Sequence, residues 1–210
     1  MPQSSIAWID FAERDQRKMM EVVSLFRERD TRDELGLGSV RDAFANLFFP
    51  GTSTIQTRAR YFLFVPWIYR YLEERKVPSR KIPRRLERQE VRIIRSLADT
   101  DEDGIIGKVS GASLQRFPST IYWNGLQRWG IRRFPGSQSQ YHRWLDRFYE
   151  IQSGRHSTLD ATGIEKPEAN WDPHLPSTPD AFPNVETLRL RLKEARYLRR
   201  RLLMSCSESR

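Results

Sequence analysis

Residues 61–71 of this chain read YFLFVPWIYRY, an aromatic run that has to lie in a folded core. The run is expected to form a helix that is kinked or broken at Pro66, because proline removes the amide that would bond back to Phe62. Its longest apolar part, from Tyr61 to Tyr69, is much shorter than the about 20 residues that a membrane span needs. The pattern therefore predicts a core helix and not a membrane segment.

The segment before this run, PGTSTIQTRAR at residues 50–60, predicts a turn in which Thr52 to Thr54 cap the following helix. Free amides and the positive partial charge at a helix N-terminus favour anions. An ordinary cap, with the arginines paired to carboxylates, explains the same residues and is the favoured interpretation. A phosphoryl-handling enzyme would also need a carboxylate or a histidine beside the turn, and the spacing of a P-loop is absent. The candidate anion site consists of Thr52, Ser53, Thr54, Arg58 and Arg60.

The segment after the run is strongly basic. From Arg58 to Arg95 there are twelve Lys or Arg residues and four Glu residues, and the whole chain has a net charge of +9. Such a surface attracts phosphates, because each neutralised phosphate releases condensed counterions. Pro78 and Pro83 predict a linker within the tract, and the apolar spacing that follows predicts a helix from Arg85 to Ala98.

Length and composition bound the class of protein. With 210 residues, of which 38% are hydrophobic, the chain can bury one sizeable core or two small ones. Its one cysteine, Cys206, excludes an internal disulfide and a thiolate metal site, which fits a reducing compartment. The first residues lack a basic stretch followed by an apolar one. We expect a cytoplasmic protein with no membrane partner.

The predicted fold is mainly α, with a few short strands. A helical N-terminal part is expected over residues 5–77, including a short strand or docking segment at Ile6–Ile9 and helices at 11–29 and 39–48. Over residues 84–151 the order of helix, short strand, helix, helix and strand predicts a winged-helix-like unit. Residues 152–186 are rich in proline and polar residues and predict an irregular loop, followed by a C-terminal helix at 187–204.

The helix from Ser119 to Trp129 is the candidate recognition helix. We expect Ile121, Tyr122, Leu126 and Trp129 to face the core. The outward residues are then Ser119, Thr120, Trp123, Asn124, Gln127 and Arg128. In a helix-turn-helix, Asn or Gln pairs with adenine and Arg pairs with guanine. A unit that only packs against another domain is an equally weighted alternative. The predicted nucleic-acid contacts are Arg80, Lys81, Arg84, Arg85, Arg132 and Arg133 on phosphates, Asn124, Gln127 and Arg128 nearest the bases, and Trp123, with Tyr141, as exposed stacking aromatics.

No complete catalytic constellation is present in the sequence. Asp99, Asp101, Asp103 and Gly104 match the start of an EF-hand loop, but Ser110 stands where the bidentate Glu is needed, so an acidic turn is favoured. The three histidines, His142, His156 and His174, lack a metal-ligand spacing. We predict no metal, no cofactor and no catalytic residue, and an enzyme is the less favoured interpretation.

Four segments resemble a bacterial family known as domain of unknown function number sixty-three sixty-one. They are SIAWIDF at 5–11, DELGLG at 33–38, FPGTSTIQTRARYF at 49–62 and STIYW at 119–123. The resemblance covers nearly the whole chain and implies no catalytic motif. It implies that genes of family members lie beside genes of helicase-like and phospholipase-D-like proteins in bacterial defence regions. It also implies members longer than this chain, so that Arg210 would be the end of an N-terminal part and a catalytic part could lie outside it.

Charge, candidate recognition helix and resemblance together favour one function. We expect a DNA-binding accessory protein of a bacterial defence or DNA-processing system, with a helicase-like or phospholipase-D-like protein as a partner. The alternative is a protein-interaction scaffold that docks a helicase or nuclease and makes no contact with nucleic acid. One continuous basic face, made by the 80–95 tract and the outward side of Ser119 to Arg128, would favour DNA binding. Burial of that helix would favour the scaffold.

Overall fold

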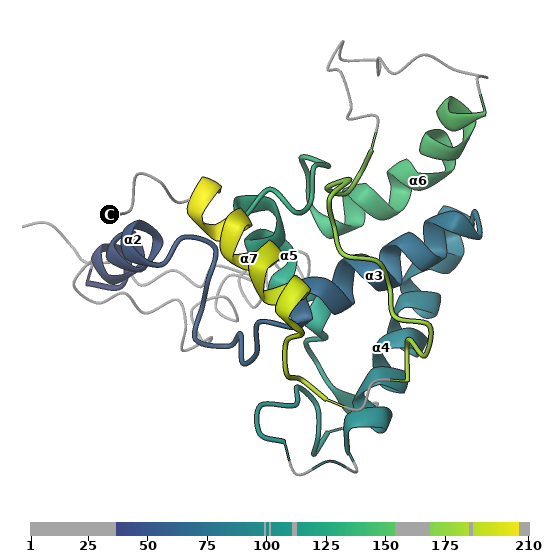
Figure 1. Ribbon diagram of the computed structural model, residues 1–210. Coiled ribbons are helices and arrows are strands. Elements are labelled where there is room, and N and C mark those ends of the chain that lie inside the picture. Colours follow the sequence, from purple (N-terminus) through teal and green to yellow (C-terminus); the bar gives the residue numbers. More distant parts are fainter. Residues whose placement is uncertain are drawn as a thin grey trace, which may run out of the picture. The chain divides into compact units, whose positions relative to one another are not determined.

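The computed structural model describes residues 37–98, 100, 102–110, 113–153, 169–184 and 187–205 (Figure 1). The chain divides into two compact units, Met1–Phe44 and Ala45–Arg210. Helices α3 to α7 and every residue of the candidate site belong to the second unit. The predicted strand at Ile6–Ile9 and the predicted helix at 11–29 lie outside the described residues.

The described part of the chain is mainly helical, as predicted. Its only β pairing is an isolated antiparallel bridge between Arg132 and Trp171, so the winged-helix-like unit over residues 84–151 is not confirmed. Residues 169–184 are irregular, in agreement with the predicted loop. The helices are α2 (Leu37–Phe48), α3 (Tyr61–Glu74), the 3-10 helix η2 (Ser79–Lys81), α4 (Ile82–Ala98), α5 (Pro118–Arg128), α6 (Gln138–Gln152) and α7 (Leu192–Ser205).

Helix α3 is the centre of the second unit. Nine consecutive residues, Tyr61–Tyr69, are buried, so neighbours cover the first part of the helix on every side. The helix runs without interruption through Pro66, and the predicted break there is therefore wrong. The amide missing at Pro66 weakens the helix locally, but most helical stability in proteins comes from packing. An all-round apolar surface supplies that packing here.

Helix α4 begins inside the tract that the prolines predicted to be a linker. Pro78 is the N-cap of η2, and Pro83 lies in the first turn of α4, where a missing amide leaves no helical bond unmade. As predicted, no single helix runs through the tract, since residues 75–78 separate α3 from η2, but the helix predicted from Arg85 starts at Ile82. Helices α4 and α5 both pack on α3 within one unit, so the chain does not divide between residues 77 and 84.

A buried carboxylate joins α4 to the start of α5. Glu90 Oε1 accepts a hydrogen bond from the Ser119 amide at 2.7 Å, and Glu90 Oε2 accepts one from the Ser119 hydroxyl at 3.1 Å. Burial raises the pKa of Glu90 to about 8, while the hydrogen bonds from Ser119 oppose this rise. The first amide of α5, that of Ser119, thus finds its acceptor in another helix and not in water.

A second buried pair attaches α7 to the start of α3. Arg60 Nη2 lies 2.9 Å from Glu194 Oε1, and both side chains are almost completely buried. Arg60 Nη1 also donates to the Thr187 carbonyl at 2.7 Å, and Glu194 Oε2 accepts from the Arg191 amide at 2.9 Å. This pair determines which side of α7 faces the core.

The titration of Glu90 gives a pH prediction. The folded chain holds the Glu90 proton up to about pH 8, whereas the unfolded chain releases it near the ordinary value of 4.5. The folded state then binds more protons between these values, so the unfolding free energy falls as pH rises through this window. Glu90→Gln removes the part of this dependence that Glu90 contributes and keeps an acceptor for the Ser119 amide. Urea unfolding of both proteins across the window measures the difference.

Two further variants complete this test. Glu90→Ala should lose about 1–3 kcal/mol at every pH, because the Ser119 amide and hydroxyl are left without their acceptor. Glu87→Gln, on the exposed side of the same helix, should follow the wild type. If Glu90→Gln keeps the pH dependence of the wild type, Glu90 titrates normally and the burial argument is wrong.

The pair between α3 and α7 gives a stability prediction. Glu194→Gln leaves the buried Arg60 charge uncompensated and should cost about 3–5 kcal/mol in chemical unfolding. Replacing both partners by apolar residues, Arg60→Met with Glu194→Leu, should recover most of that loss, since no charge stays buried. Arg196→Gln, an exposed position of α7, should change stability by about 0.5 kcal/mol or less. A Glu194→Gln protein as stable as the wild type would contradict the role of the pair.

Candidate nucleic-acid interface

A row of exposed arginines runs along α4. At about 100° of rotation per residue, these side chains fall within about 100° of the helix circumference and extend for about 17 Å. No acidic, aromatic or amide side chain falls within that sector. All five are exposed, and the opposite side of the helix is buried on the core. We call this set the basic stripe: Arg84, Arg85, Arg88, Arg92 and Arg95.

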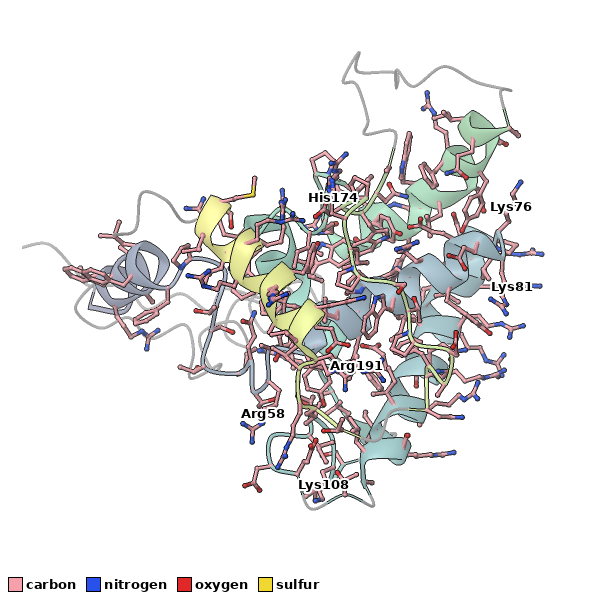
Figure 2. All side chains as sticks on the ribbon, viewed as in Figure 1. Arg58, Lys76, Lys81, Lys108, His174 and Arg191 are labelled. Carbon is pink, nitrogen blue, oxygen red and sulfur yellow. The ribbon has the colours of Figure 1, made fainter. Side chains whose placement is uncertain are left out.

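The basic stripe continues into η2. Arg80 and Lys81 precede α4 and are both exposed. Figure 2 shows Lys81 with its side chain pointing away from the neighbouring helices. Within the described residues, no ion pair links the stripe, Arg80 or Lys81 to a carboxylate. Glu87 is the only exposed acidic residue of α4, so this surface keeps most of its positive charge for a partner.

The exposed side of α5 agrees with the prediction except at Ser119 and Trp123. Thr120, Asn124, Gln127 and Arg128 are exposed, and Tyr122 and Leu126 are buried as expected. Ser119 is buried, because Glu90 of α4 covers it, so the prediction that it lies outside is wrong.

The two aromatics predicted to be exposed are both buried. Trp123 is 5% exposed, and its indole nitrogen donates to the Gly136 carbonyl at 3.0 Å. Tyr141 is fully buried, and its hydroxyl donates to Glu73, which also accepts from Trp171. Neither side chain can stack on a base in this fold. Both predictions of an exposed aromatic are therefore wrong. The sequence could not distinguish the two roles, because core aromatics and stacking aromatics are the same residue types.

Arg132 was predicted to touch phosphates, but it is 2% exposed and belongs to the core. Its guanidinium lies 4.2 Å from the centre of the Trp123 ring. It donates to Gln127 Oε1 at 2.6 Å and to the carbonyls of Gly136, at 2.8 Å, and Phe134. Burial lowers the pKa of Arg132 to about 10. The guanidinium therefore stabilises the chain after α5 and is not available to a ligand.

Arg133, the other arginine predicted in the wing, is half exposed. One terminal nitrogen lies 4.0 Å from Asp172 Oδ1, at the limit of an ion pair. Asp172 is itself buried and accepts from Tyr197 at 2.9 Å. Part of the Arg133 charge is thus balanced within the fold, and the rest faces solvent.

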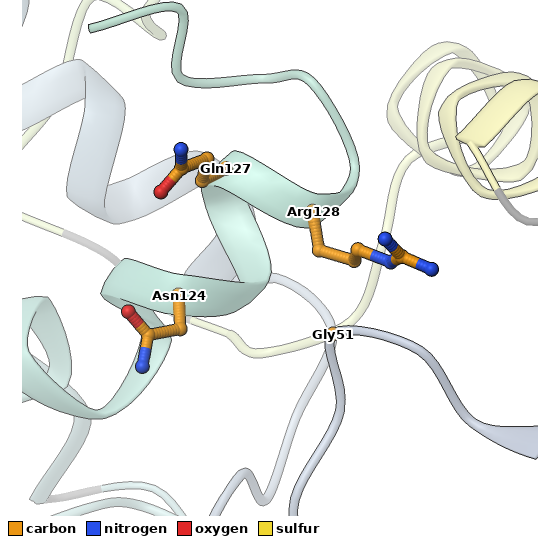
Figure 3. Close-up of a pocket in the computed structure, with 4 residues that line it drawn as sticks. All are labelled: Gly51, Asn124, Gln127 and Arg128. Atoms are coloured by element: carbon orange, nitrogen blue, oxygen red, sulfur yellow. The ribbon is translucent and has the colours of Figure 1, made fainter. Parts of the chain in front are cut away.

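An open pocket of about 600 Å³ lies at the exposed end of α5. Asn124, Gln127 and Arg128 project from the helix, and Gly51 lies on the neighbouring turn (Figure 3). The helix and the turn are in close contact, because a Cβ on Gly125 would lie 2.3 Å from the Gly51 carbonyl oxygen. The three residues predicted nearest the bases therefore share one polar hollow.

The basic stripe and this pocket do not form a single face. Glu90, on the buried side of α4, binds the first turn of α5, whereas the stripe lies on the opposite side of α4. Asn124, Gln127 and Arg128 belong to the other half of α5. The structure thus groups Arg84 and Arg85 on α4, after Arg80 and Lys81, and groups Asn124, Gln127 and Arg128 at one pocket, but it keeps the two groups apart.

The candidate anion site is dispersed. Helix α3 begins at Tyr61 with Arg60 as its N-cap, so Thr52, Ser53 and Thr54 do not cap it. Thr52 instead donates to the Phe49 carbonyl at 2.9 Å. Arg60 is paired with Glu194, in agreement with the interpretation that the arginines of this segment pair with carboxylates. Arg58 donates to the Asp103 carbonyl at 2.8 Å. Arg58 and Arg60 thus have partners elsewhere in the fold and do not form one site with the three hydroxyl residues.

The described residues contain no group of three or more His, Cys, Asp or Glu side chains that could hold a metal ion. Asp99, Asp101 and His156 lie outside them. His142 lies 2.8 Å from the Tyr69 hydroxyl, and burial lowers its pKa to about 4, so it is neutral near pH 7. None of the helices in the described ranges is long and apolar enough to cross a bilayer.

Sequence reasoning selected Arg84 and Arg85 but not Arg88, Arg92 and Arg95 as phosphate contacts. The signal was present, because residues spaced by three, four and seven positions share a helix face. The helix predicted from Arg85 already contained Arg85, Arg88, Arg92 and Arg95, and only Arg84 lay before it. With the helix beginning at Ile82, the five arginines form one surface.

A comparison with known families gives a single result. A model of a family of unknown function (DUF6361) matches residues 3–207, essentially the whole chain. No curated protein and no solved structure matches the chain. The match agrees with the resemblance seen in the four sequence segments. The chain therefore belongs to the family of unknown function DUF6361.

Proposed function

We propose that this chain is a DNA-binding accessory protein that holds the phosphate backbone with the basic stripe of α4. The observation that carries the proposal is five exposed arginines on one helix face with no carboxylate among them. Fixed cations in a row neutralise successive phosphates and release counterions, which is the main source of sequence-independent affinity. Arg80 and Lys81 extend the same surface at its N-terminal end.

The composition of the stripe favours duplex DNA over a single strand. Proteins that bind single strands combine basic grooves with exposed aromatics on which bases stack. The stripe offers no aromatic, and Trp123 and Tyr141 are buried. It also offers no Asn or Gln to read a base edge. We therefore assign to α4 backbone contacts that do not depend on sequence.

A base-reading role for α5 is the finer part of the proposal. In a helix-turn-helix the N-terminal residues of the recognition helix reach the bases. Glu90 covers Ser119 at that end of α5, so the predicted base-reading residues that stay accessible are Asn124, Gln127 and Arg128. A winged-helix mode of binding rests on these three residues alone, and a comparison of duplexes of different sequence tests it.

Charge reversal on the stripe tests the main proposal. Arg84→Glu with Arg85→Glu should remove two phosphate contacts and reduce the slope of log K against log salt by about 1.8. The loss of affinity should be on the order of 50-fold at 0.1 M salt. Fluorescence anisotropy of a labelled duplex over a salt series measures both quantities. Circular dichroism checks that the variant is folded.

A matched control separates the stripe from overall charge. Lys108→Glu with Arg143→Glu changes the net charge equally at two exposed positions outside the basic stripe. This variant should keep the slope of the wild type and lose much less affinity. Absence of duplex binding by the wild type at low salt, or equal slopes for all three proteins, would contradict the proposal.

The scaffold hypothesis has one observation in its favour. The open pocket beside Gly51 has a polar lining from Asn124, Gln127 and Arg128 and is large enough to receive side chains of another protein. Under this hypothesis a helicase or nuclease partner co-purifies with the chain, Asn124→Ala with Arg128→Ala weakens that association, and the stripe variant does not. A defence context, a helicase-like or phospholipase-D-like partner and a cytoplasmic location stay predictions.

A further inference from the structure

Helix α7 carries a second unpaired basic surface. Lys193, Arg196, Arg199 and Arg200 are all exposed, and Lys193, Arg196 and Arg200 fall within about 60° of the helix circumference. The only acidic residue of the helix, Glu194, is buried against Arg60. No ion pair joins these four cations to a carboxylate in the described ranges. We call this set the α7 patch.

The α7 patch has a fixed orientation, because three contacts attach another side of α7 to the core. Glu194 pairs with Arg60, and the Tyr197 hydroxyl donates to Asp172 Oδ2 at 2.9 Å. Arg201 Nε donates to the Trp129 carbonyl at 2.8 Å. The helix cannot turn over without breaking all three, so the patch faces solvent.

Helices α4 and α7 bind the two ends of α5. Glu90 of α4 accepts from Ser119 in the first turn of α5, and Arg201 of α7 donates to Trp129, its C-cap. Ten residues of helix separate these contacts by about 15 Å. Figure 1 shows α7 to the left of α3 and α4 to its lower right. Each helix packs its own buried side on the rest of the unit, so the basic stripe and the α7 patch are separate surfaces on different helices.

We propose that the α7 patch is a second duplex-binding surface, so that one protein molecule bridges two segments of DNA. The inference rests on the proposed function, because it assigns to α7 the same phosphate contacts as to α4. The two surfaces lie on different helices that hold opposite ends of α5, so each can contact a duplex of its own. Like the stripe, the α7 patch contains no aromatic or amide side chain, so neither segment is selected by sequence.

A capture experiment tests the bridge. A biotinylated duplex is fixed on streptavidin beads, and a fluorescent duplex of different sequence is added with the protein at low salt. The wild type should retain fluorescence on the beads. The α7 variant, Lys193→Glu with Arg196→Glu and Arg200→Glu, should bind a single duplex with an affinity close to that of the wild type but retain at most one tenth of the fluorescence. These positions are exposed and contact nothing that holds α7 in place.

Two further variants interpret the result. Reversal of three stripe residues, Arg84, Arg85 and Arg88, should also abolish bridging and leave weaker binding through α7. Reversal of Lys108, Arg116 and Arg143, three scattered exposed positions, gives the same charge change and should leave bridging intact. Light scattering establishes whether the protein is a monomer under the same conditions.

The outcomes distinguish this inference from the proposed function. If the α7 variant bridges as well as the wild type, a second DNA surface on α7 is excluded, whereas binding through α4 is unaffected. If the wild type binds one duplex but never retains the second, the bridge is likewise refuted. If the wild type binds no duplex at all, both proposals fail. Loss of bridging in the scattered control would attribute it to overall charge and also overturn the inference.

Discussion

The burial of α3 on all sides is the constraint on which the rest of the second unit depends. Nine consecutive residues need cover, and α4, α5 and the irregular segment with Trp171 and Leu175 belong to the same core cluster. Once these elements turn their apolar sides toward α3, their charged sides have to face solvent. The two basic faces are therefore a geometric result of how one apolar helix is enclosed.

Helices with a clear apolar period could be predicted from the sequence. Those at 39–48, 85–98, 119–129 and 140–151 were found within a few residues, because helical spacing and caps are local signals. The predictions at Pro66 and Pro83 failed, because the effect of a proline depends on its position in the helix and on the packing around it. Local sequence does not give either of these. Whether residues 84–151 resemble a winged helix depended on strand pairing, which short extended segments do not specify.

The candidate site was predictable residue by residue but not as an arrangement. Exposure of Asn124, Gln127 and Arg128 follows from the period of α5, and so does that of the α4 arginines once the helix start is known. The relation between α4 and α5 depends on the contact of Glu90 with Ser119, which lies 29 residues further along the chain. A single sequence gives no sign that these two residues meet. Proximity in sequence therefore suggested one face where the fold has two.

Arg132 has a consequence for how sequences of this family should be compared. Its guanidinium binds carbonyls of Phe134 and Gly136 and the side chain of Gln127, so it replaces the backbone pairing that a sheet would supply there. Lysine, with one compact ammonium, cannot reach all of these acceptors. If relatives retain an arginine at this position, the reason is that the fold needs it. A search for ligand contacts based on retained basic residues should set it aside.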